Sequence, residues 1–288
     1  MKFSFFIRVL FPVFCFLFSS ITVAQEKSIS GIIIDADTEE PVALANLGVK
    51  SKWKGTVTDS KGKFKLSTTG LIGTDTLEIS KLGYKKEKII LSDFFLENQG
   101  PMIFKLKSIA LELPEFTFNS QSEGKIKTIG SLPTNTVFGF AFSPKNTPLA
   151  ESLGREITIA INPKSEKLLL DTIKISFSNL EVDSVTLRVN AYYDQGGIPG
   201  EKFFESLWQI DNQGPGVFAL SLGELGVYFE QKSFVSVELV NVDKNEKYGI
   251  VTIPVSMSLG SHLVRLSSLG EWTKARGNPA IQVLFRKY

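Results

Sequence analysis

The sequence of 288 residues contains one cysteine, Cys15, and one histidine, His262. Cys15 lies in an N-terminal apolar segment, so the rest of the chain has neither a disulfide framework nor a reactive thiol. One histidine without cysteine partners cannot assemble a typical zinc site. No glycine-rich loop opens a helix, which removes the usual phosphate-binding motifs. Thiol, zinc and nucleotide chemistry therefore have no support in the sequence.

A secretory signal peptide is predicted for residues 1–24, because a positive start, a short apolar run and a small-residue cleavage site follow one another. These features are carried by Lys2 and Arg8, Val9–Phe18, and Thr22–Ala24. The run is too short for a membrane span, although an uncleaved anchor stays open as an alternative. A lipoprotein is not expected, because Cys15 lies inside the apolar run.

Removal of this leader changes the charge of the protein. The whole chain has 32 basic and 30 acidic residues, and the leader holds two of the basic ones. The remaining 264 residues (288 − 24) therefore carry 30 basic (32 − 2) and 30 acidic side chains. A neutral surface gives no electrostatic case for nucleic acid or anionic lipid. We expect an exported protein that does not span a membrane after cleavage and lies in the periplasm, at the outer membrane or outside the cell.

The stretch Gly31–Leu91 has the clearest strand and turn pattern in the chain. In the segment Thr58–Phe64, Asp59 can accept backbone N–H groups and Gly62 can adopt the positive φ that closes a loop. Phe64 begins an alternation of apolar and polar residues, which is typical of a half-buried strand. The pattern predicts a hairpin with Phe64 in a core.

About seven short strands are predicted between residues 28 and 106, with the spacing of a small antiparallel sandwich. The segment resembles the carboxypeptidase regulatory-like domain, a transthyretin-like β-sandwich, in the form typical of Bacteroidetes envelope proteins. The matching positions are Gly31, Asp35, Glu40-Pro41, Ala45-Asn46, Gly55-Thr56, Thr58-Asp59, Gly62, Phe64, Ile79-Ser80 and Gly83-Tyr84. The resemblance implies structural roles for these residues and no catalytic one.

We predict an all-β protein with a seven-stranded N-terminal sandwich at residues 25–118, a linker at 119–135 and a larger, jelly-roll-like sandwich at 136–288. The linker is rich in Ser, Gly, Lys and Asn. The last segment resembles a C-terminal β-sandwich of undefined role that accompanies the regulatory-like domain in Bacteroidetes. That resemblance rests on Asp183–Val185, Gly196–Gly200, Phe234–Val240 and Gly270–Trp272.

Catalytic patterns are weak. A Ser-His-Asp triad would have to use His262, and the segment around Ser221 lacks the first glycine of a nucleophile elbow. A glycosidase needs two carboxylates, but no spacing singles out a pair among the candidates Glu201, Glu205, Glu238 and Asp243. We predict that the protein is not an enzyme, and keep an esterase or glycosidase as a minor alternative.

Aromatic side chains are the main candidates for ligand contacts. Tyr192 and Tyr193 alternate along a strand, so one of them is expected to be exposed and able to stack on a sugar. Trp272 precedes the last strand, and Trp53 lies among lysines in a loop or caps the sandwich end. Trp208 is expected in the core.

No cofactor is predicted, and calcium stays open as an alternative. Asp35, Asp37 and Glu39 alternate along an extended segment, and Asp194 has possible acidic partners in loops of the second sandwich, as Ca²⁺ sites require. The partners considered for Asp194 are Asp211 and Asp243. The ligand candidates are thus Tyr192, Trp272, Trp53 and Asp194.

Two functional hypotheses follow. The first is a non-catalytic structural, adaptor or binding module of the envelope, with protein partners. The second is a carbohydrate-binding module, favoured by the aromatic residues near β loops and by the carbohydrate-binding-like fold that the N-terminal resemblance implies.

Overall fold

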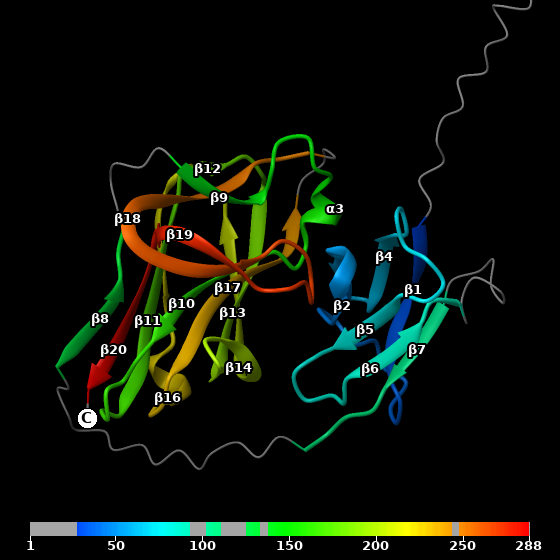
Figure 1. Ribbon diagram of the computed structural model, residues 1–288, viewed down its shortest axis with the longest axis horizontal. Helices are drawn as coiled ribbons and strands as arrows, with labels where there is room; N and C mark the ends of the chain where they lie inside the picture. Colours follow the sequence, from blue (N-terminus) through cyan, green and yellow to red (C-terminus); the bar gives the residue numbers. More distant parts are fainter. Residues whose placement is uncertain (1–27, 93–101, 111–124, 133–137, 244–247, 288) are drawn as a thin grey trace, which may run out of the picture.

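The computed structural model describes residues 28–92, 102–110, 125–132, 138–243 and 248–287. These residues are predominantly strand and form two sandwich-like units, one blue to cyan and one green to red in Figure 1, which confirms the predicted all-β fold. The predicted signal peptide lies outside the described residues. In the described part, no helix has the length and apolar character needed to cross a bilayer.

The N-terminal unit consists of two sheets with a core between them. One sheet has the order β4-β1-β7, and the other has the order β3-β2-β5-β6. The strands are β1 (Ser28–Asp35), β2 (Asn46–Val49), β3 (Lys54–Val57), β4 (Lys63–Ser67), β5 (Thr76–Ser80), β6 (Glu87–Ile90) and β7 (Met102–Leu106). β1 and β7 run parallel, so the predicted purely antiparallel arrangement is wrong at this pair.

The turn chemistry of Thr58–Phe64 is confirmed, but the hairpin is not. Asp59 Oδ1 accepts the backbone N–H groups of Lys61 and Lys63 at 2.8 and 2.9 Å, and Gly62 has φ 69°. Phe64 is buried in the core. However, β3 pairs with β2 and β4 pairs with β1, so this turn carries the chain from one sheet to the other.

The C-terminal unit is also built from two sheets. The larger sheet has the order β12-β18-β10-β17-β13-β14, with β9 and β19 also paired to β18. Its strands are β9 (Phe138–Ser143), β10 (Glu156–Ile161), β12 (Asn179–Leu180), β13 (Ser184–Gln195), β14 (Ile198–Asp211), β17 (Ser233–Asp243), β18 (Val251–Arg265) and β19 (Thr273–Pro279).

The smaller sheet of this unit has the order β15-β11-β20-β8, with β16 paired to β11. Its strands are β8 (Ile126–Gly130), β11 (Leu168–Phe177), β15 (Gly216–Ser221), β16 (Tyr228–Phe229) and β20 (Ile281–Lys287). β8 pairs with β20 along five residues. The predicted linker at 119–135 is therefore wrong in part, because Ile126–Gly130 is a strand of the second unit.

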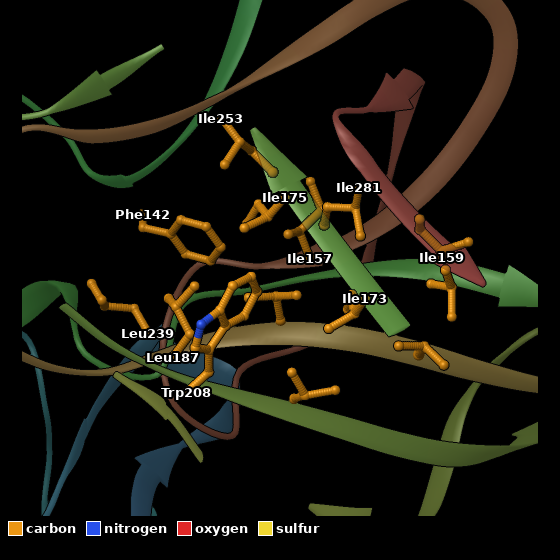
Figure 2. Close-up of a cluster of buried hydrophobic side chains, with 14 of the residues drawn as sticks. Phe142, Ile157, Ile159, Ile173, Ile175, Leu187, Trp208, Leu239, Ile253 and Ile281 are labelled. Atoms are coloured by element: carbon orange, nitrogen blue, oxygen red, sulfur yellow. The ribbon is translucent and has the colours of Figure 1, made fainter. Parts of the chain in front are cut away.

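The core of the C-terminal unit lies between its two sheets. Ile157 and Leu187 of the larger sheet and Ile173 of the smaller sheet are fully buried there. Figure 2 shows Trp208 of β14 among these side chains, which confirms its predicted core position. Short helical turns join the strands outside this core. They are η1 (Lys50–Lys52), α3 (Leu149–Ser152) and η2 (Gly223–Leu225).

Candidate functional site

The larger sheet of the C-terminal unit has a second buried face, opposite its apolar core. Along β13, Val185, Leu187 and Val189 belong to the core. Alternation of side chains places the intervening residues, including Arg188 and Asn190, on the outer face. Both are fully buried although they are polar. Buried polar groups need hydrogen-bond partners. We therefore expect specific hydrogen bonds and ion pairs on this face.

Four charged residues form a row across this face. The strand register places Arg265 of β18 opposite Glu156 of β10, Glu156 opposite Glu238 of β17, and Glu238 opposite Arg188 of β13. The order of charges is plus, minus, minus, plus. We call these four residues the charged row.

Hydrogen bonds hold the charged row together. Arg188 donates from Nε and Nη2 to Glu238 Oε2 at 3.0 and 2.9 Å. Arg265 forms an ion pair with Glu156. The Asn190 amide donates to Glu156 Oε1 at 2.8 Å and to Glu238 Oε2 at 3.0 Å, so it bridges the two carboxylates. Because every charge has an opposite partner, the cost of burying the four ions is offset.

Aromatic side chains close one end of the row. Tyr192 donates its hydroxyl to Glu156 Oε1 at 2.9 Å, and its ring lies edge-to-face with Trp272 at a centroid distance of 6.1 Å. The Arg265 guanidinium lies 4.8 Å from the centre of the Trp272 ring, within the range of a cation–π contact. Tyr192 and Trp272 therefore support Arg265 and Glu156 within the fold.

The N-terminal unit covers the other end of the row. Asn46 of β2 donates to Glu238 Oε1 at 2.5 Å and to Ser268 Oγ at 2.9 Å, and it also accepts from Arg188. Arg188 Nη1 donates to the backbone carbonyl of Leu44 at 2.7 Å. Figure 1 shows β2 on the side of its unit that faces the larger sheet. Asn46 thus inserts a polar side chain from one sandwich into the charged row of the other.

The backbones of the two units also approach closely near Asn46. A Cβ added to Gly48 of β2 would lie 2.1 Å from the carbonyl oxygen of Ser268, and one added to Gly55 of β3 would lie 2.3 Å from it. A second polar contact lies beside the row, where Lys81 of the N-terminal unit pairs with Glu205 of β14. The interface therefore combines small residues with charged hydrogen bonds.

Glu238 and Arg265 of the charged row keep their charges near neutral pH. Burial opposes ionisation of Glu238, but Arg188 and Arg265 outweigh it and lower the pKa of Glu238 to about 2. Burial likewise opposes the charge on Arg265, and Glu156 nevertheless raises the pKa of Arg265 above its usual value. Burial and the nearby Glu156 raise the pKa of Tyr192. None of these three groups is set to exchange a proton near neutral pH.

Lys202 of β14 lies next to the row and behaves differently. Burial lowers its pKa, the positive charge of Arg188 lowers it further, and the result is about 8 despite the attraction of Glu205. Lys202 Nζ donates to Glu205 Oε2 at 3.1 Å and lies 5.7 Å from the centre of the Tyr192 ring. The side chain of Glu205 also approaches Arg188, at 3.7 Å.

A cavity of about 380 Å³ lies on the same outer face, farther along β10. Thr158 of β10 is buried, whereas Ala160, two residues on, is exposed, so the face opens between them. The lining of the cavity includes Thr158 and Ala160, together with Phe234 at the start of β17, Asp194 at the end of β13 and His262 of β18. The volume falls within the range of ligand pockets, roughly 300–1,000 Å³. We call this cavity the outer-face pocket.

His262 lines the outer-face pocket without a catalytic arrangement around it. Its Nδ1 lies 2.9 Å from the carbonyl oxygen of Gly277. Burial lowers the pKa of His262, against the opposing effect of the Gly277 carbonyl. Asp194 Oδ1 accepts the backbone N–H of Gly197 at 2.9 Å, and Ser233 donates to the carbonyl of Gln231. Among the described residues, no hydrogen bond joins His262 to a serine or an acid.

The structure thus separates the predicted ligand residues. One member of the Tyr192 and Tyr193 pair is exposed, as predicted, but it is Tyr193, at 38%, whereas the ligand candidate Tyr192 is 5% exposed. Tyr192 and Trp272 come together at the charged row, whereas Asp194 lies in the outer-face pocket. Trp53 is 45% exposed and lines a separate, smaller groove between the two units, whose lining also includes Arg155.

The calcium sets considered from the sequence do not assemble. Asp211 and Asp243 both lie opposite Ser184 at the start of β13, whereas Asp194 lies near the end of that strand. Ten residues of strand separate the two ends by about 33 Å. In the other set, Asp35 Oδ1 accepts two backbone N–H groups of its own turn. In the described residues, no group of three or more His, Cys, Asp or Glu side chains could hold a metal ion.

Most of the charged row was not predicted from the sequence. The sequence indicates Glu238 only as one of four candidate carboxylates, and its motifs do not include Arg188, Glu156 or Arg265. For Arg188, Glu238 and Arg265, the signal is a charged residue between two apolar neighbours in the sequence. The partners become visible only when the register of four strands, far apart in sequence, is known.

The family of the N-terminal unit is supported by a sequence comparison. The model of the CarboxypepD_reg-like domain family matches residues 29–118. This confirms the predicted resemblance for that segment. A comparison with curated proteins gives no match.

Comparison with solved structures gives only distant likenesses. A structure of the infectious bursal disease virus Gt strain has 13% identity and a TM-score of 0.27, and covers 90% of this chain and 60% of that chain. The VP2 subviral particle of the same virus has 10% identity and a TM-score of 0.25, with 91% and 64% covered. The chain thus spans less than two thirds of both viral chains.

A third likeness is to a structure described by the promiscuous specificity of carbohydrate-binding modules from the β-sandwich superfamily. It has 9% identity and a TM-score of 0.20, and covers 79% of this chain and 97% of that chain. Likenesses at these scores carry no argument about this protein.

Proposed function

We propose that this protein, whose residues 29–118 match the carboxypeptidase regulatory-like domain family, is an exported, non-catalytic binding module of the cell envelope. Export is supported by the signal-peptide pattern of residues 1–24. The partners that we propose are envelope proteins or glycans. The two sandwiches act as one body, and the outer face of the larger sheet provides the contact surface.

The observation that carries this proposal is the use of the buried ions. Arg188 and Glu238 are the groups most suited to electrostatic chemistry, yet they bond to each other and to Asn46 of the other unit. These hydrogen bonds use the charges of the row to join the two domains. The outer-face pocket beside it offers hydrogen-bonding groups, and its histidine is bonded to a backbone carbonyl. This arrangement supports binding over bond cleavage.

A fractionation experiment tests the export part of the proposal. Cells expressing the full chain should contain a shortened protein in the periplasmic, outer-membrane or extracellular fraction. A version without residues 2–24 should stay in the cytoplasm. An uncleaved full chain that stays in the cytoplasm would contradict the proposal.

The non-catalytic part is tested with panels of ester and glycoside substrates. The chain from Gln25 to Tyr288 should hydrolyse none of them above background. Hydrolysis that disappears in His262→Ala or in Glu205→Gln would replace the proposal with the esterase or glycosidase alternative, respectively.

A second candidate function is carbohydrate binding in the outer-face pocket. It is supported by the lining, which combines the hydroxyl group of Ser261 and the amide of Asn162 with the apolar side chains of Phe234 and Leu263. Sugar-binding sites combine polar groups for the hydroxyls with apolar groups for the C–H faces of the ring.

A glycan array probed with the chain from Gln25 to Tyr288 tests this candidate. The expected result is binding to a limited set of glycans that the substitution Ala160→Trp removes, because the new side chain fills the pocket from an exposed position. Ala219 of β15 is an exposed alanine on the other sheet, so Ala219→Trp is the matched control. An array without signal would remove carbohydrate binding.

A further inference from the structure

We propose that the outer-face pocket is specific for acidic saccharides, with Lys232 and Lys274 binding a sugar carboxylate. This inference rests on the second candidate function given above and names the ligand class of the same pocket.

The strand order sets the shape of the pocket. β10 and β17 are neighbours in the middle of the larger sheet, and their residues Ala160 and Phe234 both line the pocket. Lys274 belongs to β19, which pairs with β18 on one side of β10. Lys232 precedes β17, and its carbonyl accepts the backbone N–H of Asp194 at 3.1 Å on the other side. The two lysines therefore come from opposite walls of one depression.

The charges of the pocket favour an anion. In the part of the chain that the structure describes, neither Lys232 nor Lys274 forms an ion pair. Asp194 is the acidic residue of the lining, and its carboxylate is engaged by the N–H of Gly197. His262 is held neutral near pH 7, because burial lowers its pKa. Two positive charges and one negative charge give the lining a net charge of +1.

The uncharged lining favours a hydroxylated ligand over a peptide. Ser261 supplies a hydroxyl group and Asn162 supplies an amide, each able to donate and accept. The Ser233 hydroxyl donates to the carbonyl of Gln231 and keeps acceptor capacity, whereas Thr158 Oγ1 bonds to both backbone groups of Leu263. Short polar groups beside a small apolar patch suit a sugar ring, whose hydroxyls need both donors and acceptors. An acidic sugar would therefore form ion pairs with the lysines through its carboxylate and hydrogen bonds with the uncharged polar groups through its hydroxyls.

The test begins with an array that carries neutral, uronate-containing, sialylated and sulfated glycans together with an acidic peptide. Binding is then measured by calorimetry with galacturonic acid trisaccharide and with its methyl ester, which keeps the ring and loses the charge. The acid should bind about tenfold more tightly than the ester, the size expected for two solvent-facing ion pairs. The difference should shrink at high salt.

Two charge-reversal variants locate the effect. Lys232→Glu and Lys274→Glu should each weaken binding of the trisaccharide about tenfold or more and leave binding of the ester little changed. Lys145→Glu makes the same change at an exposed lysine outside the lining and should bind like the wild type. Thermal unfolding of each variant verifies that the fold is retained.

The other outcomes separate this inference from the function on which it rests. Binding of neutral glycans only, or equal binding of acid and ester, overturns the acidic specificity and leaves carbohydrate binding standing. Binding of the acidic peptide in place of glycans overturns both in favour of a peptide site. An array with no signal at all also overturns both.

Discussion

Asn46 Nδ2 donates a hydrogen bond of 2.5 Å to Glu238 Oε1, although the two residues are 192 positions apart and belong to different sandwiches. Asn46 is 4% exposed and Glu238 is fully buried. A buried carboxylate that loses a partner keeps its desolvation cost, so this contact joins the stability of the two units.

The charged row should behave as a set of mutually dependent ions. Arg188→Met leaves Glu238 buried with fewer opposite charges and should lower the free energy of unfolding by about 3–5 kcal/mol. The double variant Arg188→Met/Glu238→Leu removes the pair together and should be less destabilised than the single variant. Urea unfolding monitored by circular dichroism measures both.

An exposed ion pair of the same unit is the control for this comparison. Lys167 Nζ lies 2.9 Å from Glu230 Oε1, and both side chains are more than half exposed. Lys167→Met should leave the free energy of unfolding unchanged within error, because such pairs are screened by water. If Arg188→Met were equally harmless, the row would not hold the interface.

Gly48 should be required at the interface between the units. Gly48→Ala places a Cβ 2.1 Å from the carbonyl oxygen of Ser268, so a backbone must move. We expect a loss of about 1–3 kcal/mol in unfolding free energy. Gly73→Ala is the matched control, since its Cβ would meet its nearest neighbour, Ser92 Cβ, at an ordinary 3.5 Å. Equal effects of the two substitutions would argue against a tight approach.

Lys202 should make stability depend on pH above neutrality. Its pKa is about 8 in the folded protein and about 10.4 in an unfolded chain. Between these values the unfolded chain binds more protons, so the stability of the protein should rise with pH from about 8 to about 10.4. Lys202→Met removes this contribution and serves as the reference.

Urea unfolding of wild type and Lys202→Met at pH 7, 8.5 and 10 measures the effect. The wild type should gain about 1–3 kcal/mol relative to the variant across this range. A constant difference between the two proteins would mean that the Lys202 pKa is not lowered by its burial and by Arg188.

The sequence predicted local features well because they depend on neighbouring residues. The cap by Asp59, the positive φ of Gly62 and the burial of Phe64 all follow from a few consecutive positions. The all-β class and the core position of Trp208 follow from alternation and composition. Such signals need no knowledge of which strands pair.

The site was harder to predict, because it depends on pairing between distant strands. Alternation predicts that the side chains of Tyr192 and Tyr193 lie on opposite faces of the sheet. Which of the two is exposed depends on the side chains that pack over each face, and the sequence pattern does not show them. The charged row requires the register of β18, β10, β17 and β13 together.

Differential scanning calorimetry of the Asn46→Leu variant asks directly whether the two sandwiches unfold as one body. Leucine has a similar size and cannot bond to Glu238, Arg188 or Ser268. The wild-type chain from Gln25 to Tyr288 should unfold in a single transition. The variant should show two, with the N-terminal unit separating at the lower temperature. Two independent transitions in the wild type that Asn46→Leu does not shift would contradict the coupling of the units through the charged row.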